Sequence, residues 1–192
     1  FIQLAAGYKH SCGIKQDGSA ICWGLDSNGQ STAPSESFTQ LAAGGNHTCG
    51  IKQDGSAICW GLNDYGQSTA SLGSFTQLAA GYKHSCGIKQ DGSAICWGLN
   101  TYGQSTAPSG SFTQLAAGTH HSCGIKQDGN TICWGLDKYG ESTVPLGNFT
   151  QLTAGDDHTC SIKEDGGAIC WGLNDYGQSA APLGSFIHLT AG

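Results

Sequence analysis

Residues 10–24 read His-Ser-Cys-Gly-Ile-Lys-Gln-Asp-Gly-Ser-Ala-Ile-Cys-Trp-Gly, and closely similar stretches begin at residues 47, 84, 121 and 158. Each copy has two β-prone arms on either side of Gln-Asp-Gly, or Glu-Asp-Gly in the fifth copy, a sequence suited to a tight turn. The sequence therefore predicts five β-hairpins, connected by the remainder of the chain.

The turn type and the cysteine pairing of this hairpin depend on each other. A three-residue loop closed by Gly18 in the left-handed region places Cys12 opposite Cys22 in a non-hydrogen-bonded pair. Such pairs bring the Cα atoms to about 4.5 Å, and a disulfide accepts roughly 4.4–6.8 Å. A two-residue Asp17-Gly18 loop would instead set Cys12 opposite Trp23 and turn Cys22 to the other side of the sheet, which forbids the bridge.

The ten cysteines form five pairs with the same spacing: Cys12 and Cys22, Cys49 and Cys59, Cys86 and Cys96, Cys123 and Cys133, Cys160 and Cys170. An even count of opposed cysteines favours disulfides and an oxidising compartment. Buried free thiols are one alternative. A zinc site on His10, Cys12 and Cys22 is another, although the close Cys-x₂-Cys spacing of structural zinc sites is missing.

A strict period of 37 residues runs through the chain. The pattern Phe-x-x-Leu-x-Ala-Gly opens at Phe1, Phe38, Phe75, Phe112, Phe149 and Phe186. Such a period with several short strands per unit predicts an all-β propeller or solenoid. We expect one repeat domain over residues 1–192, with units 1–37, 38–74, 75–111, 112–148 and 149–185, and with residues 186–192 beginning a sixth.

Each unit is expected to form a blade of up to four antiparallel strands, which in the first unit are Gln3–Ala6, residues 11–16, Ala20–Gly24 and a short outer strand near residues 30–33. Apolar residues on both faces of the hairpin predict a sheet covered on both sides, as between propeller blades. Gly13 is expected to leave space for a tryptophan ring. The tryptophans are expected in the core between blades: Trp23, Trp60, Trp97, Trp134 and Trp171.

Composition and charge exclude several classes of partner. The net charge is −6, with eight lysines and no arginine, which disfavours nucleic acid and anionic membrane surfaces. No apolar run approaches the roughly 20 residues of a membrane span, so no membrane insertion is expected. The chain lacks Met and begins with Phe, which indicates a processed or excised product, and we favour a segment cut from a longer array.

The pattern Ala-Ala-Gly-x-x-His-Ser/Thr-Cys…Asp-Gly…Cys-Trp-Gly-Leu-Asn-x-Tyr-Gly-Gln resembles the regulator of chromosome condensation repeat family across the whole chain. It is most similar to bacterial members with paired cysteines and Cys-Trp-Gly. The resemblance implies a β-propeller of four-stranded blades, typically seven, whereas this chain has five units. Some secreted bacterial members bind another protein through one propeller face. Nucleotide-exchange activity is not implied, because the chain has neither an inserted wedge nor arginine.

The repeated polar residues indicate structure rather than catalysis. His10, His47, His84, His121 and His158 occur once per unit, whereas a catalytic histidine is normally needed once. We expect them to make a structural hydrogen bond beside the glycine turn. No nucleophile elbow, phosphate loop or paired carboxylates interrupt the repeat, so we expect no enzyme, no cofactor and no metal.

Two variable segments per unit predict the binding surface. They follow the Ala-Gly and precede the Gly-Gln/Glu, and in an up-and-down blade both lie at the same end, on loops of a rigid scaffold. The alternative is neutral drift in exposed loops. The candidate binding residues are Tyr8, Lys9, Asn46, Tyr65, Tyr82, Lys83, Tyr102, His120, Tyr139, Asp156, Asp157 and Tyr176.

These features favour a non-enzymatic β-propeller that is secreted, periplasmic or on the cell surface and that binds another macromolecule, above all a protein. A carbohydrate-binding propeller is one rival, because repeated tyrosines stack on sugar rings. A structural element of a longer extracellular array or filament is another. Residues 1–7 and 186–192 are copies of one strand, so either the ring is not closed at five units or the surplus strand pairs elsewhere, including with a neighbouring molecule.

Overall fold

The computed structural model describes residues 1–192 and consists of strands, turns and irregular segments without a helix. No segment of it therefore qualifies as a membrane-spanning helix. The strands are β1 (Gln3–Ala6), β2 (His10–Ile14), β3 (Ala20–Gly24), β4 (Phe38–Ala43), β5 (His47–Lys52), β6 (Ala57–Gly61), β7 (Phe75–Ala80), β8 (His84–Lys89), β9 (Ala94–Gly98), β10 (Phe112–Ala117), β11 (His121–Lys126), β12 (Thr131–Gly135), β13 (Phe149–Ala154), β14 (His158–Lys163) and β15 (Ala168–Gly172).

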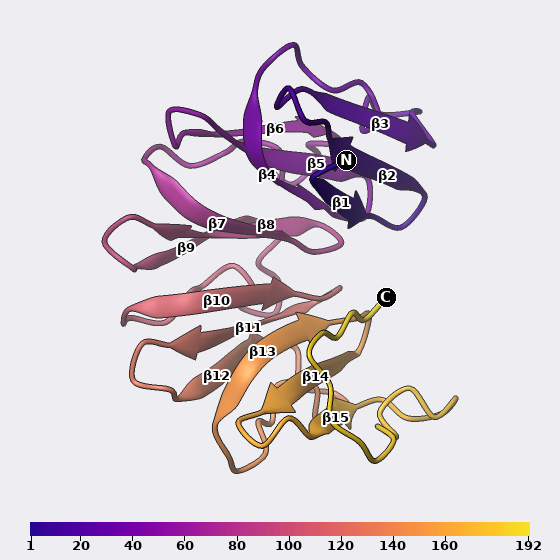
Figure 1. Cartoon of the computed structure of the whole chain (residues 1–192), viewed down its shortest axis with the longest axis vertical. Coiled ribbons are helices and arrows are strands. Elements are labelled where there is room, and N and C mark those ends of the chain that lie inside the picture. The colour runs from indigo at the N-terminus through magenta and orange to yellow at the C-terminus, as the bar shows by residue number, and fades with distance from the viewer.

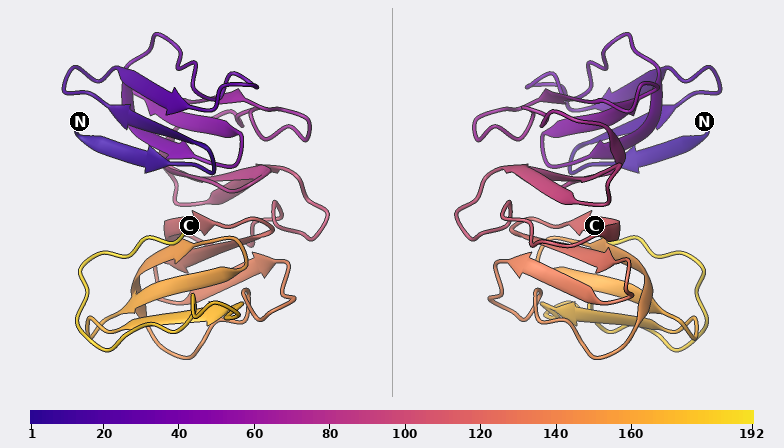
Figure 2. Two further views of the ribbon diagram at one scale, coloured as in Figure 1. Left: turned by 90° about the vertical axis from the view of Figure 1, so that its right-hand side faces the viewer. Right: turned by 90° about the vertical axis from the view of Figure 1, so that its left-hand side faces the viewer.

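The strands form five antiparallel sheets of three strands each, one per repeat and ordered as in the chain, from β1-β2-β3 to β13-β14-β15. We call these sheets blades 1 to 5. In Figure 1 the blades follow one another along an arc, from β1–β3 in indigo to β13–β15 in orange. Figure 2 shows the same succession from two other sides. The architecture is a β-propeller of repeated blades.

The hairpin register is the one that the three-residue loop predicts. Cys12 pairs with Cys22 and Ile14 with Ala20, and the same pairing recurs in every blade. All ten cysteines form intra-hairpin disulfides, with Cα separations of 4.0 to 4.1 Å. Neither free thiols nor a zinc site on Cys12 and Cys22 is compatible with this bonding, because zinc requires thiolate ligands.

Glycine closes the turn of each hairpin. Gly18 has a φ of +83°, which lies in the left-handed region that glycine enters without a Cβ clash. Its N–H donates to the Lys15 carbonyl at 3.0 Å, and the Lys15 N–H donates to the Ser19 carbonyl at 2.9 Å. This is the turn that the sequence predicts, and it fixes which residues face each other along the hairpin.

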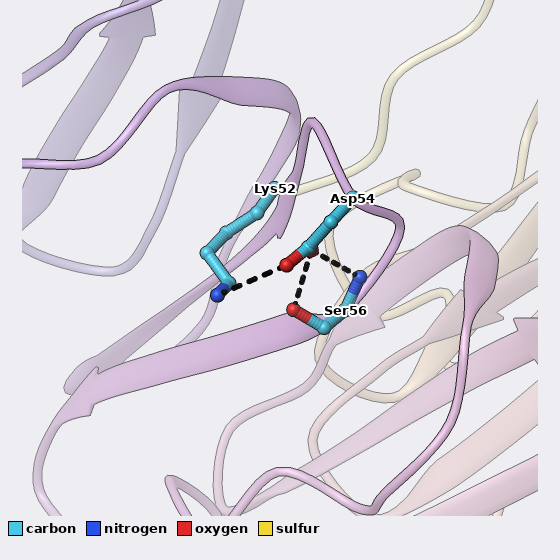
Figure 3. A network of polar contacts seen from close by, with 3 residues as sticks. All are labelled: Lys52, Asp54 and Ser56. Carbon is cyan, nitrogen blue, oxygen red and sulfur yellow. Dashed lines mark hydrogen bonds and ion pairs between the residues drawn. The ribbon is translucent and has the colours of Figure 1, made fainter.

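The aspartate of the same turn stabilises it through its side chain. In blade 2, Asp54 Oδ1 accepts the Ser56 N–H at 2.9 Å and the Ser56 hydroxyl at 2.6 Å, while Lys52 Nζ lies 3.5 Å from Asp54 Oδ2 (Figure 3). The bonds from Ser56 lower the pKa of Asp54. The exposed aspartates at this position therefore stabilise the turn.

Two expectations from the sequence are wrong. Residues 30–31 lie in a turn and residues 32–33 in an irregular segment, so they do not form a fourth strand, and the outer edge of blade 1 carries only an isolated bridge between Ser19 and Ser37. Gly13 leaves space for a phenylalanine rather than a tryptophan, because a Cβ there would lie 2.6 Å from the Phe1 ring. The corresponding Cβ at Gly50 would lie 2.5 Å from the Phe38 ring.

The hydrophobic core lies between neighbouring blades. Phe38 and Leu41 of β4 are buried against Cys12 and Ile14 of β2. The Trp60 ring packs on the same cluster, with its centroid 5.7 Å from that of Phe38. The placement between blades is therefore confirmed for Trp60, Trp97, Trp134 and Trp171, whereas Trp23, at the free face of blade 1, is exposed. Each blade buries its apolar surface against the next one.

A glutamine side chain joins each inner strand to the next. Gln3 Nε2 donates to the Leu41 carbonyl at 2.9 Å, and the Leu41 N–H donates to Gln3 Oε1 at 2.8 Å. This glutamine clamp recurs between Gln40 and Leu78, Gln77 and Leu115, and Gln114 and Leu152. It satisfies backbone groups that a strand at a blade interface would otherwise leave unpaired.

The repeated histidines also bond from one blade to the next. His10 Nε2 lies 2.8 Å from Thr48 Oγ1, and Thr48 donates to the Gln30 carbonyl at 3.1 Å. Trp60 Nε1 donates to the same carbonyl at 3.0 Å. Three further interfaces repeat this network with His47 and Ser85, His84 and Ser122, and His121 and Thr159. The structural hydrogen bond expected for the histidines is confirmed for His10, His47, His84 and His121, whereas the His158 side chain makes no bond of this kind.

The two ends of the arc differ from its interior. Phe1, at the free face of blade 1, is 66% exposed, whereas the equivalent Phe38 is 1% exposed. At the other end, residues 186–192 lie against blade 5, where the Leu189 N–H donates to Gln151 Oε1 at 2.9 Å. Because nothing covers the free face of blade 1, the five blades form an open arc rather than a closed ring.

Candidate interaction face

Both variable segments of each repeat lie at one end of the blades. The first and second strands are antiparallel, as are the second and third, so the loop between the first two and the segment after the third share an end. We call this end the loop face and its two segments the inner and outer loops. The opposite end, with the Gln-Asp-Gly turns, is the turn face.

A buried side chain holds each outer loop in place. In blade 2, Gln67 is buried and its Oε1 accepts the Tyr65 N–H at 2.9 Å. Asn63 Oδ1 accepts the Ser68 N–H at 2.9 Å, and the Ser68 hydroxyl donates to the Leu62 carbonyl at 2.7 Å. The backbone of the loop is therefore fixed while the Tyr65 ring remains exposed.

The outer loop of one blade contacts the inner loop of the next. Lys83 Nζ of blade 3 lies 4.9 Å from the ring centroid of Tyr65 in blade 2 and 5.7 Å from that of Tyr82. The Tyr102 ring of blade 3 packs edge-on against His120 of blade 4, at 5.3 Å between centroids. Aromatic and cationic side chains from separate repeats thus form one continuous surface.

The surface becomes acidic toward blade 5. Lys138 Nζ donates to the Tyr139 hydroxyl at 2.7 Å, which raises the pKa of Lys138, with a smaller contribution from Asp157. The Thr119 hydroxyl donates to Asp156 Oδ1 at 2.7 Å. Asp156 and Asp157 therefore give this end of the loop face a negative charge, opposite to the lysines of blades 1 and 3.

Glu141 replaces the buried glutamine in blade 4. Its Oε1 accepts the Lys138 N–H at 3.2 Å and its Oε2 accepts the Tyr139 N–H at 2.7 Å. In the glutamine blades only the amide oxygen is used, and Gln67 Nε2 has no partner. Sequence reasoning missed this anchor, although a glutamine or glutamate at the same point of every repeat was the available signal.

A hollow of about 620 Å³ lies where the inner strands end, lined by their alanine and glycine residues and by Tyr8 and Tyr82. The Tyr8 and Tyr82 rings meet edge-on at 5.9 Å between centroids. Gly45 makes this approach possible, since a Cβ there would lie 2.5 Å from the Tyr82 carbonyl oxygen. The volume lies within the range of ligand-binding cavities in proteins.

A somewhat larger hollow, about 780 Å³, lies at the turn face between blades 1 and 2. Its walls are polar, with Lys15, Glu36 and Lys52 among them, and contain no aromatic side chain. Because aromatic anchors and repeat-to-repeat variation both occur at the loop face, we place the candidate site there.

The remaining predicted residues take separate positions. Lys9 Nζ lies 5.2 Å from the Tyr8 ring centroid, at the free end of the arc. The Asn46 backbone carbonyl accepts the Leu62 N–H at 2.8 Å. Tyr176, in the outer loop of blade 5, is 93% exposed and stands apart from the other tyrosines.

Comparison with known proteins agrees with this architecture. The family described as the regulator of chromosome condensation (RCC1) repeat matches residues 1–30, 38–67, 75–104, 112–141 and 149–178. No curated protein matches the sequence. The fold defines a propeller of repeated blades with an exposed loop face. The chain belongs to the regulator of chromosome condensation repeat family.

Solved structures similar to this chain include the ectodomain of the receptor kinase CR4 from Physcomitrella patens, with a TM-score of 0.74 and 31% identity over 88% of this chain and 49% of that one. Yeast RCC1 (Prp20) bound to Kap60 has a TM-score of 0.79 and 20% identity, over 90% of this chain and 56% of that one. Prp20p from Saccharomyces cerevisiae, whose binding to Gsp1p and histones was described with its structure, has a TM-score of 0.78 and 18% identity, over 92% of this chain and 58% of that one. The chain thus spans about half the length of these structures.

Proposed function

We propose that this chain is a non-enzymatic binding propeller that holds a protein partner on its loop face. The observation that carries the proposal is the meeting of variable residues from separate repeats, as in the contacts of Lys83 with Tyr65 and Tyr82. The turn face, by contrast, repeats Gln-Asp-Gly in four of the five units. Tyrosines on a rigid backbone are common anchors of protein interfaces.

Protein binding by similar propellers supports this proposal. Prp20 was solved in complex with Kap60, and Prp20p was described with its binding to Gsp1p and histones. Five disulfides suit an oxidising environment, which favours a site of action in a secreted, periplasmic or cell-surface setting.

Paired variants test this function. Immobilised protein captures partners from extracellular fractions, and binding of a captured partner is then measured for Tyr65→Ala, Tyr102→Ala and Tyr139→Ala. Each tyrosine variant should weaken binding by about 1–2 kcal/mol, the value typical of an interface anchor. Gln53→Ala and Gln90→Ala, exposed on the turn face, are the matched controls and should bind as the parent does.

The opposite pattern, in which the turn variants lose the partner and the tyrosine variants keep it, contradicts the proposal.

A glycan array tests the alternative of a carbohydrate ligand. Saturable binding to one class of sugar, abolished by Tyr102→Ala, would show that the loop face binds a glycan and not a protein.

A further inference from the structure

One lysine of the loop face lies between two tyrosine rings, at the interface of blades 2 and 3. Lys83 Nζ is 4.9 Å from the ring centroid of Tyr65, in the outer loop of blade 2. It is 5.7 Å from the ring centroid of Tyr82, its neighbour in the inner loop of blade 3. Blades 1 and 4 flank this pair of blades, so complete neighbours on both sides fix the position of the three side chains.

The Lys83 ammonium has no acceptor within the chain, although its side chain is half-buried. The one ion pair of the structure joins Lys52 and Asp54 on the turn face. Lys138, another lysine of the loop face, donates to the Tyr139 hydroxyl at 2.7 Å. The three N–H groups of Lys83 therefore stay free for an acceptor from outside, while the two rings hold the ammonium in place.

A glycine of blade 2 leaves room for the aromatic side chains beside this lysine. Gly45 is buried and occupies the inner-loop position that carries tyrosine in blades 1 and 3. A Cβ there would lie 2.6 Å from a carbon of the Tyr82 ring. In its absence the Tyr8 and Tyr82 rings meet edge-on, with 5.9 Å between centroids. The free ammonium thus stands next to an apolar wall of tyrosine rings.

We propose that Lys83, Tyr65 and Tyr82 form a subsite for the carboxylate of an aspartate or glutamate on the protein partner. This inference rests on the proposed function and adds the chemistry by which the partner is recognised. A carboxylate complements a positive charge that has no counterion in the chain, and it accepts charge-assisted hydrogen bonds from the ammonium. The methylene groups of the acidic residue pack against the tyrosine rings. At the same inner-loop position, blades 2, 4 and 5 carry Asn46, His120 and Asp157.

Peptides of defined sequence provide the probe. A phage-displayed library of random peptides is selected for binding to the full chain, and the peptides that bind Lys83→Met less well are synthesised. We expect each of them to carry an aspartate or glutamate. Replacing that residue by its amide should weaken binding to the parent protein about three- to tenfold, as expected for a charged hydrogen bond at a partly exposed site.

A double-mutant cycle then assigns the contact. The amide peptide and the acidic peptide should bind Lys83→Met equally, because the two changes remove the same interaction. Lys89→Met is the matched control, since Lys89 ends β8 of the same blade at the turn face, and it should bind the acidic peptide as the parent does. Near-UV circular dichroism of the free variants checks that each retains its packed aromatic core.

Three results overturn this subsite. One is that no selected peptide depends on Lys83, or that those which do lack an acidic residue. Another is an amide change that weakens binding to Lys83→Met as much as to the parent. The third is binding of acidic sugars on a glycan array that Lys83→Met abolishes, while no acidic peptide binds.

The proposed function has its own readout in the same experiment. Peptides that Tyr102→Ala weakens still place the binding surface at the loop face, even when the carboxylate subsite fails. Peptides that only Gln53→Ala weakens, on the turn face, contradict both proposals.

Discussion

The buried histidines illustrate how single residues join the blades. The Thr48 hydroxyl has one proton, which it donates to the Gln30 carbonyl, so it accepts its bond to His10 from a protonated Nε2. The network therefore assigns the Nε2–H tautomer and leaves Nδ1 of His10 buried without a partner. A second proton on Nδ1 would create a buried charge with nothing to balance it.

This arrangement predicts a loss of stability in mild acid. Burial, together with a smaller effect of neighbouring histidines, lowers the pKa of His47 to about 4, of His84 to about 3 and of His121 to about 4. In the unfolded chain the value is near 6.5, so below that pH the unfolded state binds protons that the folded state does not. Stability should be complete above pH 6.5 and fall by about 4 kcal/mol per pH unit well inside the window between 6.5 and 4.

Urea unfolding between pH 7.5 and 4.5 measures this slope. His84→Gln should reduce it by about one third, because one of the three strongly shifted groups is then lost. A denaturation midpoint that does not change with pH would show that the histidines are not held neutral in the folded protein.

Glycine at the end of the inner strand has a different role from glycine in the outer loop. A Cβ at Gly81 would lie 2.4 Å from the Gly118 carbonyl oxygen of the next blade, whereas a Cβ at Gly103 meets nothing within 4 Å. Gly81→Ala should therefore cost about 2–3 kcal/mol by forcing two backbones apart. Gly103→Ala should cost only about 1–2 kcal/mol, from its positive φ. Thermal unfolding of the two variants measures both losses of stability. Equal losses in Gly81→Ala and Gly103→Ala would contradict the close packing of the inner strands.

At the scale of the element, the hairpin could be predicted almost completely. Its loop of Gln16, Asp17 and Gly18 sets the register, and the register sets the disulfide, so local chemistry was sufficient. The conformation of the outer segment of each unit, near residues 30–33 in the first, could not be predicted from β-strand propensity. In blade 2 the Asn63 side chain accepts a backbone N–H of the loop, and such side-chain bonds compete with strand pairing.

The contacts between blades also could not be predicted from the sequence. His10 and Thr48 are 38 residues apart, as are Gln3 and Leu41. A strict repeat shows which positions recur, but it does not show which position of one unit meets which position of the next. That pairing depends on how the blades pack, and only the assembled structure gives it. Strand direction alone determines which loops share an end, so the common position of the variable segments could be predicted, while their role in binding stays a prediction.

The five hairpin disulfides allow a prediction about stability and about the mass of the oxidised protein. Each closes a short loop and should contribute about 2–3 kcal/mol as an upper bound, through the lower entropy of the unfolded chain. The intact protein purified without reductant should be lighter by two hydrogens for each of the five bridges. Alkylation in denaturant without reductant should label no cysteine, and labelling of all ten would contradict the bonding.

On the scale of the whole molecule, the open arc explains why chemically identical positions differ in burial. Phe38 is covered by blade 1, while Phe1, its counterpart, faces solvent. The stabilising unit is thus the interface between two blades and not the single blade. Each added repeat buries one more apolar face, the behaviour expected of a repeat protein whose units contact only their neighbours.

The loop face is most acidic at its blade 5 end. Lys9, Lys83 and Lys138 lie on blades 1, 3 and 4, whereas Asp156 and Asp157 lie together on blade 5. An uneven charge distribution of this kind orients a partner as it approaches, and it affects the association rate more than the affinity.

Amide hydrogen exchange of the chain with and without a captured protein partner tests whether the loop face binds that partner, because it reports on both faces at once. We expect slower exchange in the inner and outer loops around Tyr65, Tyr82, Tyr102 and Tyr139, and unchanged exchange in the Gln-Asp-Gly turns. Protection confined to the turns, with the tyrosine loops unchanged, would contradict the assignment of the loop face as the binding surface.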